Sequence, residues 1–216
     1  MSEIKTVIQC DFDGTITDED VSYKMLEAYA KDGWHKIRDD YHEGKISVGV
    51  FNTSAFAMVK AGKEKLLEVS RNTMQLRPGL PELVDCCRKK GFRFTIISNG
   101  LDFYIEDMMK NIGLDNLEIH AAATTFFPGG LEAQYIGPGG EVLDNGLKEA
   151  YADLFLAEGY RVIYMGNGVS DIPSAVKCHH IFAASELLEY CEKHPELSYT
   201  PLTDFHEAAE ILENSF

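Results

Sequence analysis

The chain has 216 residues, of which 45% are hydrophobic and 25% are charged, and its formal net charge is −15. This length and composition fit one large globular domain, or one domain with a small inserted one, with enough residues to bury a core. The acidic excess favours solubility and repels phosphate backbones, which argues against nucleic acid as a partner. Most of this charge is interpreted as a solvated surface, and part of it as a cation site.

No stretch resembles a secretory signal or a membrane span. The first apolar run is short and ends at Asp11, and no segment approaches the roughly 18 apolar residues that a spanning helix needs. The five cysteines are Cys10, Cys86, Cys87, Cys178 and Cys191. Their number is odd and their spacing is not that of a zinc site. We therefore predict a reduced, cytoplasmic protein with no membrane partner; the sequence carries no signal of its oligomeric state.

The first predicted element is a short buried strand over residues 4–10. Residues 21–70 then follow a helical pattern, interrupted at Gly33, Gly44 and Gly62, which predicts a bundle of short helices directly after the first strand. The apolar faces of the four helices are Met25, Leu26 and Tyr29; Ile37 and Tyr41; Val50, Phe51, Phe56 and Met58; and Leu66, Leu67 and Val69.

Strands alternate with helices from residue 78 onward. The predicted order is a helix from Pro78 or Pro81 to Gly91, a strand at 92–100, a helix at 101–111, a strand at 117–123, a glycine-rich hairpin at 124–141, a helix capped by Asp144 or Asn145 and ending near 158, a strand at 160–165, a helix capped by Ser170 or Asp171, a strand at 181–184, a helix capped by Ser185 and a helix at 203–214.

This alternation predicts an α/β fold with a doubly wound, mostly parallel, Rossmann-like sheet. In such sheets the ligand crevice lies at the carboxyl ends of the strands. Three predicted strands end in polar turns that contain glycine, at residues 11–14, 98–100 and 166–168. We expect these turns to open on one edge of the sheet and to carry the chemistry.

Asp11 and Asp13 are the first candidates for that chemistry. Residues one apart at an extended strand end point to the same side, so both carboxylates can reach one small volume. Such ligands suit Mg²⁺, which usually takes one or two carboxylates plus substrate phosphate, and a carboxylate can also act as a nucleophile. A turn with two solvated acids is the alternative.

Ser98, Asn99, Gly100 and Lys148 are candidates for binding a phosphate ester. The Ser98 hydroxyl and the backbone N–H groups of Asn99 and Gly100 can hold a phosphate oxygen, although an ordinary strand-to-helix turn has the same composition. Lys148, near the start of a predicted helix, could hold both a phosphate and a nucleophilic carboxylate, or simply solvate its helix.

Asn167 and Asp171 lie on a loop and a helix start, and their spacing lets both face a cation. The alternative for Asp171 is a helix N-cap.

Together these motifs resemble those of the haloacid dehalogenase-like hydrolase superfamily. The match consists of D-x-D-G-T at residues 11–15, an apolar strand ending in Ser98, the lone Lys148, and G-x-G-x-x-D at residues 166–171. The resemblance implies that Asp11 attacks phosphorus to form an aspartyl-phosphate, and that Asp13 is the general acid and then the general base.

The same resemblance implies a metal site and a substrate class. Magnesium would lie against Asp11, the backbone carbonyl of Asp13, and Asn167 and Asp171, while Ser98 and Lys148 bind the phosphoryl group. Relatives that cleave carbon–halogen bonds lack the second aspartate and need no metal. The presence of Asp13 therefore favours a phosphatase acting on a small phosphorylated metabolite.

Residues 18–76 match the helical cap that many members insert after the first motif, which leaves residues 1–17 and 77–216 as the catalytic core. Such a cap closes over the site, excludes water and selects the substrate. The layout is most similar to the phosphoserine phosphatase group and its neighbours, which include the phosphatases acting on 2-hydroxy-3-keto-5-methylthiopentenyl 1-phosphate.

Two departures from the family pattern bear on function. Asn167 stands where the family usually has aspartate, so we expect weaker magnesium binding with activity retained. A phosphate-binding or regulatory protein that has lost turnover is the alternative that this residue supports.

The second departure concerns the substrate. Asp20 stands where phosphoserine phosphatases place an acid facing the substrate amine, but no arginine or lysine occurs from Ile46 to Val59, around Thr53, to hold a carboxylate. This favours a less charged, sugar-like or keto phosphate, with phosphoserine as the runner-up. Alternatively, Asp20 is a helix cap and Thr53 is ordinary helix.

Overall fold

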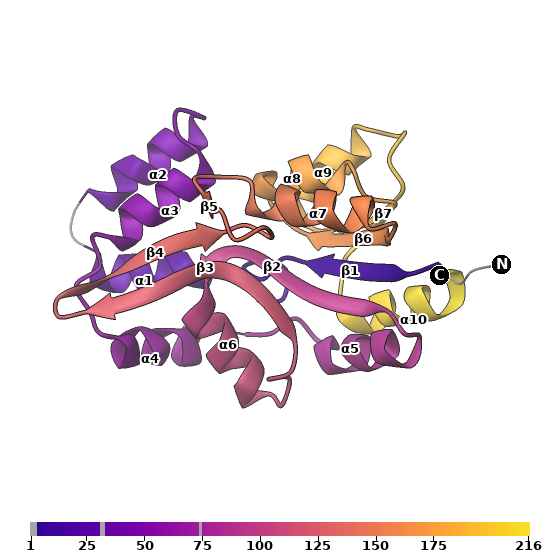
Figure 1. Cartoon of the computed structure of the whole chain (residues 1–216), viewed down its shortest axis with the longest axis horizontal. Helices are drawn as coiled ribbons and strands as arrows, with labels where there is room; N and C mark the ends of the chain where they lie inside the picture. The colour runs from indigo at the N-terminus through magenta and orange to yellow at the C-terminus, as the bar shows by residue number, and fades with distance from the viewer. Residues whose placement is uncertain (1–3, 31–32, 74) are drawn as a thin grey trace.

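The computed structural model describes residues 4–30, 33–73 and 75–216, and these form an eight-stranded sheet with helices on both faces (Figure 1). The order across the sheet is β5-β4-β3-β2-β1-β6-β7-β8. The strands are β1 (Thr6–Cys10), β2 (Arg93–Leu101), β3 (Glu118–Phe127), β4 (Gly130–Ile136), β5 (Val142–Leu143), β6 (Arg161–Gly166), β7 (His180–Ala183) and β8 (Tyr199–Pro201).

The sheet is parallel from β3 to β8, and β4 and β5 are antiparallel additions at one edge. All five residues of β1 are buried, because the strand has a neighbour on each side and helices above and below. The predicted α/β fold with a doubly wound, mostly parallel sheet is confirmed.

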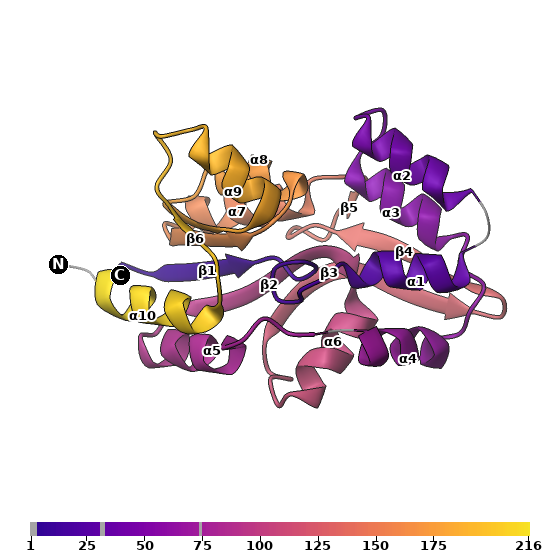
Figure 2. The same ribbon diagram turned by 180° about the vertical axis from the view of Figure 1, so that it is seen from behind.

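Helices α5, α6 and α10 cover one face of the sheet, and α7, α8 and α9 cover the other, as Figures 1 and 2 show from opposite sides. These helices are α5 (Leu80–Lys89), α6 (Asp102–Asn111), α7 (Leu147–Ala157), α8 (Ile172–Ala175), α9 (Ser185–Glu192) and α10 (Phe205–Ser215). No helix in the described ranges is long and apolar enough to cross a membrane.

The four helices predicted after the first strand are present as α1 (Val21–Tyr29), α2 (Trp34–His42), α3 (Val48–Phe56) and α4 (Lys63–Thr73). Helix α1 packs against α4, α2 packs against α3, and α3 lies against β4. The chain leaves the core and returns to it side by side, because Thr17 and Leu76 form an antiparallel bridge.

The division into a core of residues 1–17 and 77–216 and a cap of residues 18–76 stays a prediction. Residues 1–3, 31, 32 and 74, which these ranges include, lie outside the described residues.

Several element boundaries differ from the predicted ones for local reasons. Strand β3 does not stop near 123, because after pairing in parallel with β2 it continues as one arm of the β3–β4 hairpin. Helix α7 begins at Leu147, later than caps at Asp144 or Asn145 predict. Its N-cap is Gly146, whose φ of 79° is a conformation that glycine adopts without strain. The short strands β5 and β8 were not predicted.

Candidate active site

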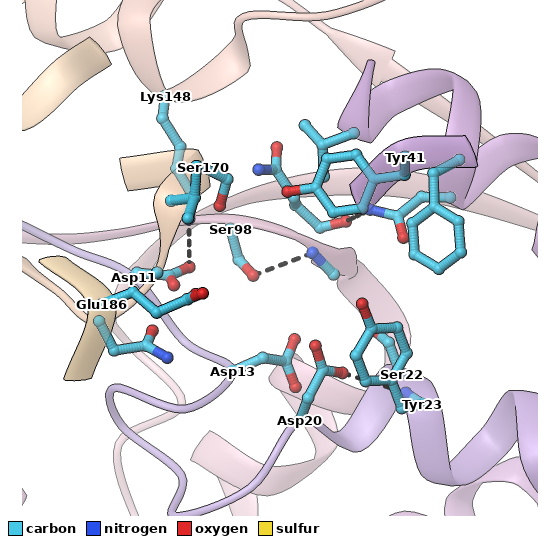
Figure 3. A pocket seen from close by; sticks show the side chains of 18 of the residues that line it. Asp11, Asp13, Asp20, Ser22, Tyr23, Tyr41, Ser98, Lys148, Ser170 and Glu186 are labelled. Atoms are coloured by element: carbon cyan, nitrogen blue, oxygen red, sulfur yellow. Dashed lines mark hydrogen bonds and ion pairs between the residues drawn. The ribbon is translucent and has the colours of Figure 1, made fainter. Parts of the chain in front are cut away.

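A cavity of about 270 Å³ opens at the carboxyl ends of β1, β2 and β6, facing helices α1, α2 and α3 (Figure 3). The predicted site residues meet here although they come from separate parts of the chain. Those that line the cavity are Asp11, Asp13, Asp20, Ser98, Asn99, Gly100, Lys148 and Asn167. Asp171 is the one predicted site residue that does not line it; its side chain is fully buried behind Lys148.

Lys148 reaches the site from the first turn of α7 and bridges two carboxylates. Its Nζ lies 2.8 Å from Asp11 Oδ1 and 2.6 Å from Asp171 Oδ1, and the lysine side chain is only 2% exposed. Burial acts to lower the pKa of Lys148, but the two carboxylates outweigh it and raise that pKa, so the side chain stays an ammonium ion. Lys148 is therefore no solvated surface lysine.

The environment of Asp11 opposes ionisation of its carboxyl group. Burial, and then the neighbouring Asp171 carboxylate, raise the pKa of Asp11 to about 7 against the opposing effect of Lys148. Two carboxylates share one ammonium ion, so positive charge is short at this point of the site.

The buried Asp171 carboxylate accepts four hydrogen bonds behind the cavity. Its Oδ1 accepts hydrogen bonds from Lys148 Nζ and, at 2.7 Å, from the Tyr164 hydroxyl. Its Oδ2 accepts the backbone N–H groups of Asn167 and Gly168, each at 2.9 Å. Asp171 stands at the N-cap position of α8, as the alternative considered from the sequence predicts, but its side chain makes no capping hydrogen bond there. Asp171 instead fixes both Lys148 and the turn after β6.

Asn167 is held by the motif that follows β1. The Thr15 hydroxyl donates to Asn167 Oδ1 at 2.8 Å. Gly14 has a φ of 77°, and a Cβ placed on it would lie 2.3 Å from Asn167 Nδ2. Glycine at this position thus allows both the turn and the close approach of the amide. This explains why glycine and threonine follow the two aspartates.

The carboxyl group of Asp13 is held from helices α1 and α6. Its Oδ1 accepts the backbone N–H of Val21 at 2.9 Å, and its Oδ2 accepts a short hydrogen bond from the Tyr104 hydroxyl. Ser22 Oγ lies 3.0 Å from the same hydroxyl. Burial, and then the nearby Asp20 carboxylate, raise the pKa of Asp13 well above its ordinary value.

Ser98, Asn99 and Gly100 do not form the predicted turn, because β2 continues to Leu101 and these residues lie where its pairing with β3 shifts register. The N–H of Gly100 donates to Ser98 Oγ at 3.0 Å, so in this structure it is already paired. The carbonyl of Asn99 accepts the side-chain amide of Asn52 at 2.9 Å, which ties this segment to helix α3.

Asp20 both caps a helix and lines the cavity. It is the N-cap of α1, where its side chain accepts the N–H of Tyr23 at 3.0 Å, and it belongs to the cavity wall. Thr53 does not line the cavity; its hydroxyl donates to the Gly49 carbonyl at 2.9 Å within α3, as the ordinary helical alternative predicts.

Several lining residues were not singled out from the sequence. Tyr23, Tyr41 and Phe51 form an aromatic wall on the helices after β1, in which the Tyr41 and Phe51 rings stack 5.5 Å apart. Tyr23 was missed, and Tyr41 and Phe51 were assigned to the apolar core faces of their helices, because a cavity-lining residue and a core residue have the same periodicity. Glu186 enters from the first turn of α9. Its position just after the parallel strand β7 was the available signal.

Within residues 4–30, 33–73 and 75–216, no three His, Cys, Asp or Glu side chains are grouped so that they could hold a metal ion by themselves. A cation in this cavity would therefore need backbone or amide oxygens, water or substrate as additional ligands.

Comparison with known proteins identifies the family. The family model of haloacid dehalogenase-like hydrolases matches residues 8–175, most of the chain. The chain belongs to this family.

Among related sequences, the 2-hydroxy-3-keto-5-methylthiopentenyl-1-phosphate phosphatase of Geobacillus thermodenitrificans is 25% identical over 212 residues, which are 96% of this chain and 95% of that protein. The bifunctional enzyme MtnB/MtnX of Bacillus licheniformis is 29% identical over 98% of this chain and 50% of that protein.

Solved structures of other proteins share this fold. A phosphoserine phosphatase, solved as a phospho-aspartyl intermediate analogue, superimposes with a TM-score of 0.70 and 19% identity over 98% of this chain and 99% of that one. At this identity the likeness shows the fold alone.

The buried ion pairs of Lys148 lead to a prediction about stability. The substitution Lys148→Met should lower the free energy of unfolding by about 3 kcal/mol, because it leaves two buried carboxylates without their partner. Urea denaturation of both proteins in metal-free buffer measures this. Lys177→Met is the control, since its pair with Asp153 is exposed and should cost less than about 1 kcal/mol. Equal losses in the two variants would contradict the prediction.

Proposed function

We propose that this protein is a magnesium-dependent phosphomonoester hydrolase that acts on a small phosphorylated metabolite through an aspartyl-phosphate on Asp11. The observation that carries the proposal is the buried Asp11 carboxylate, 2.8 Å from Lys148 at the base of a cavity that Asp13 and Ser98 also line. A nucleophile, a general acid and donors for a phosphoryl group are thus within one small volume.

In the first step, a carboxylate oxygen of Asp11 forms a bond to phosphorus as the bond from phosphorus to the leaving oxygen breaks. Asp13, in its protonated form, gives its proton to that oxygen, which departs as an alcohol. The raised pKa of Asp13, caused by burial and by Asp20, suits an acid that must carry a proton near neutral pH.

In the second step, water attacks phosphorus and the bond from phosphorus to Asp11 breaks. Asp13, now a carboxylate, takes the proton of the water, so that inorganic phosphate leaves and both aspartates return to their starting states. Lys148 and the Ser98 hydroxyl are positioned to hold the phosphoryl oxygens in both steps.

The site fits a divalent cation. Asp11 and Asp171 share the single ammonium group of Lys148. After burial, a neighbouring carboxylate also raises the pKa of each catalytic aspartate, Asp171 for Asp11 and Asp20 for Asp13, so negative charge is in excess. Asp11, the backbone carbonyl of Asp13 and the amide of Asn167 would hold magnesium. Asp171, predicted from the sequence as a direct ligand, would support them by fixing the Asn167 turn. Bound magnesium supplies positive charge against the phosphoryl oxygens.

The cavity walls favour a leaving group without a carboxylate. Lys148 is the sole lysine or arginine among the described residues that line the cavity, and Asp20 and Glu186 add negative charge. A carboxylate there would be desolvated without a partner. We therefore infer a keto or sugar-like phosphate ester. The ester named for the relative from Geobacillus thermodenitrificans is of this kind.

The first prediction of this proposal concerns metal and nucleophile. The protein should release p-nitrophenol from p-nitrophenyl phosphate in the presence of magnesium, and the rate should fall to background with excess EDTA or in Asp11→Asn, because the variant has no carboxylate to attack phosphorus. Absorbance of the released phenolate measures both. Metal-dependent release no greater than that of Asp11→Asn would overturn the proposal and favour a phosphate-binding protein without turnover.

A second prediction concerns Asn167. Asn167→Asp adds an anionic ligand, so the magnesium concentration for half-maximal activity should fall by about 10-fold, which corresponds to about 1.4 kcal/mol. The metal-free variant should also melt at a lower temperature, because the new charge faces an already acidic site. Asn116→Asp, which adds the same charge on an exposed turn, is the control. Tight magnesium binding by the protein with Asn167, measured without substrate, would contradict the expectation that this residue weakens magnesium binding.

A third prediction separates substrate classes with two matched pairs of esters. Phosphoethanolamine is phosphoserine without its carboxylate, and glycerol 3-phosphate replaces the carboxylate of 3-phosphoglycerate by a hydroxymethyl group. In each pair the ester without a carboxylate should have the higher kcat/KM, by about 10-fold or more, because the described lining residues offer a substrate carboxylate no lysine or arginine other than Lys148. Phosphoserine emerging as the best of the four would instead favour the runner-up assignment.

A further inference from the structure

We propose that Tyr104 is a positioning residue for the general acid: with Ser22, it holds the carboxyl group of Asp13 in the orientation from which it protonates the leaving oxygen. This inference rests on the function proposed above and adds two residues that the sequence motifs do not include.

The contacts that carry it converge on one carboxyl group from two helices. Tyr104 on α6 has no exposed surface, and its hydroxyl donates to Asp13 Oδ2. Because a tyrosine hydroxyl has a single proton, the 3.0 Å contact with Ser22 Oγ is completed by the serine donating to the tyrosine oxygen. The Val21 N–H occupies Oδ1 from the start of α1.

Gly100 provides independent evidence that this arrangement is built into the site. A Cβ placed on Gly100 would lie 1.9 Å from the Tyr104 hydroxyl oxygen and 2.6 Å from Asp13 Oδ2. The tyrosine hydroxyl and the aspartate oxygen thus occupy the space that a side chain would need at the end of β2. The lack of space next to these two oxygens explains why residue 100 is a glycine.

The geometry leaves the carboxyl group free to react. Each carboxyl oxygen of Asp13 has two lone pairs, and Tyr104 and Val21 take one on each oxygen. One lone pair on each oxygen remains for the proton that is given to the leaving oxygen and later taken from water. The donors fix the plane of the group in both protonation states, which is what an acid that becomes a base requires.

The test is the dependence of kcat/KM on the leaving group in Tyr104→Phe. p-Nitrophenyl phosphate can lose its leaving group as the nitrophenolate anion, without protonation. Phenyl phosphate and glycerol 2-phosphate need a proton on the leaving oxygen, so that phenol or an alcohol departs. We expect the variant to lose about 10- to 100-fold in kcat/KM with phenyl phosphate and glycerol 2-phosphate, but less than about 3-fold with p-nitrophenyl phosphate. The ratio kcat/KM is the quantity to compare, because it reports the steps through departure of the leaving group.

Tyr151→Phe is the matched control. Tyr151 is also buried and its hydroxyl makes one hydrogen bond, 2.7 Å from His120 Nδ1, but it does not line the cavity. Its loss should leave the dependence on the leaving group unchanged. Ser22→Ala should change that dependence in the same direction as Tyr104→Phe, though less, and it decides the question if Tyr104→Phe does not fold by circular dichroism.

Equal losses with all three esters, or no loss, in a folded Tyr104→Phe would overturn the inference while leaving the phosphatase proposal intact. A wild-type protein inactive toward every ester would overturn both.

Discussion

The ammonium group of Lys148 contacts the carboxylates of Asp11 and Asp171 at 2.8 and 2.6 Å, and all three side chains are almost fully shielded from water. A well-packed apolar cluster of similar volume is often as stable as buried charges of this kind, so stability does not account for them. They are understandable if the protein needs an ionised carboxylate next to a fixed cation. Other features follow from this contact. Both oxygens of the buried Asp171 carboxylate need donors, and the N–H groups of Asn167 and Gly168 that donate to its Oδ2 fix the turn after β6.

The order of the strands brings these groups together. Strand β1 lies between β2 and β6, so Asp11, Ser98 and Asn167, near the carboxyl ends of these three strands, are neighbours although they are far apart in sequence. Lys148 reaches the same edge from α7, which packs against both β2 and β6. The helices that follow β1 then close the open side with aromatic and acidic residues. The residues proposed for the phosphate chemistry thus come from the strand ends and from α7, and the other walls of the cavity come mainly from α1, α2 and α3.

The positions of residues near strand ends could be predicted from the sequence, and the positions of residues brought together by packing could not. Asp11 and Asn167 directly follow apolar strands and Ser98 follows the apolar part of β2, so topology alone places their polar groups at one edge. Tyr104 lies in a helix with an apolar face, where a core tyrosine has the same pattern. Only the three-dimensional packing of α6 against α4, β2 and β3 brings its hydroxyl to Asp13. The same reason explains why the sequence suggested Asp171 only as a metal ligand or a helix cap, and not as the acceptor of four buried hydrogen bonds.

The bridge between Thr17 and Leu76 has a consequence for how such a protein can diversify. Since the chain departs and returns at adjacent points, the segment between them can lengthen, shorten or be exchanged while the register of the sheet stays unchanged. Contacts with the rest of the protein constrain any replacement. Val21 and Ser22, at the start of that segment, contact Asp13 and Tyr104, and Asn52 on α3 donates to the carbonyl of Asn99. If the protein works as proposed, exchange of this segment would change selectivity for the leaving group, but the first helical turn of the segment would have to be kept, because it contacts the proposed general acid.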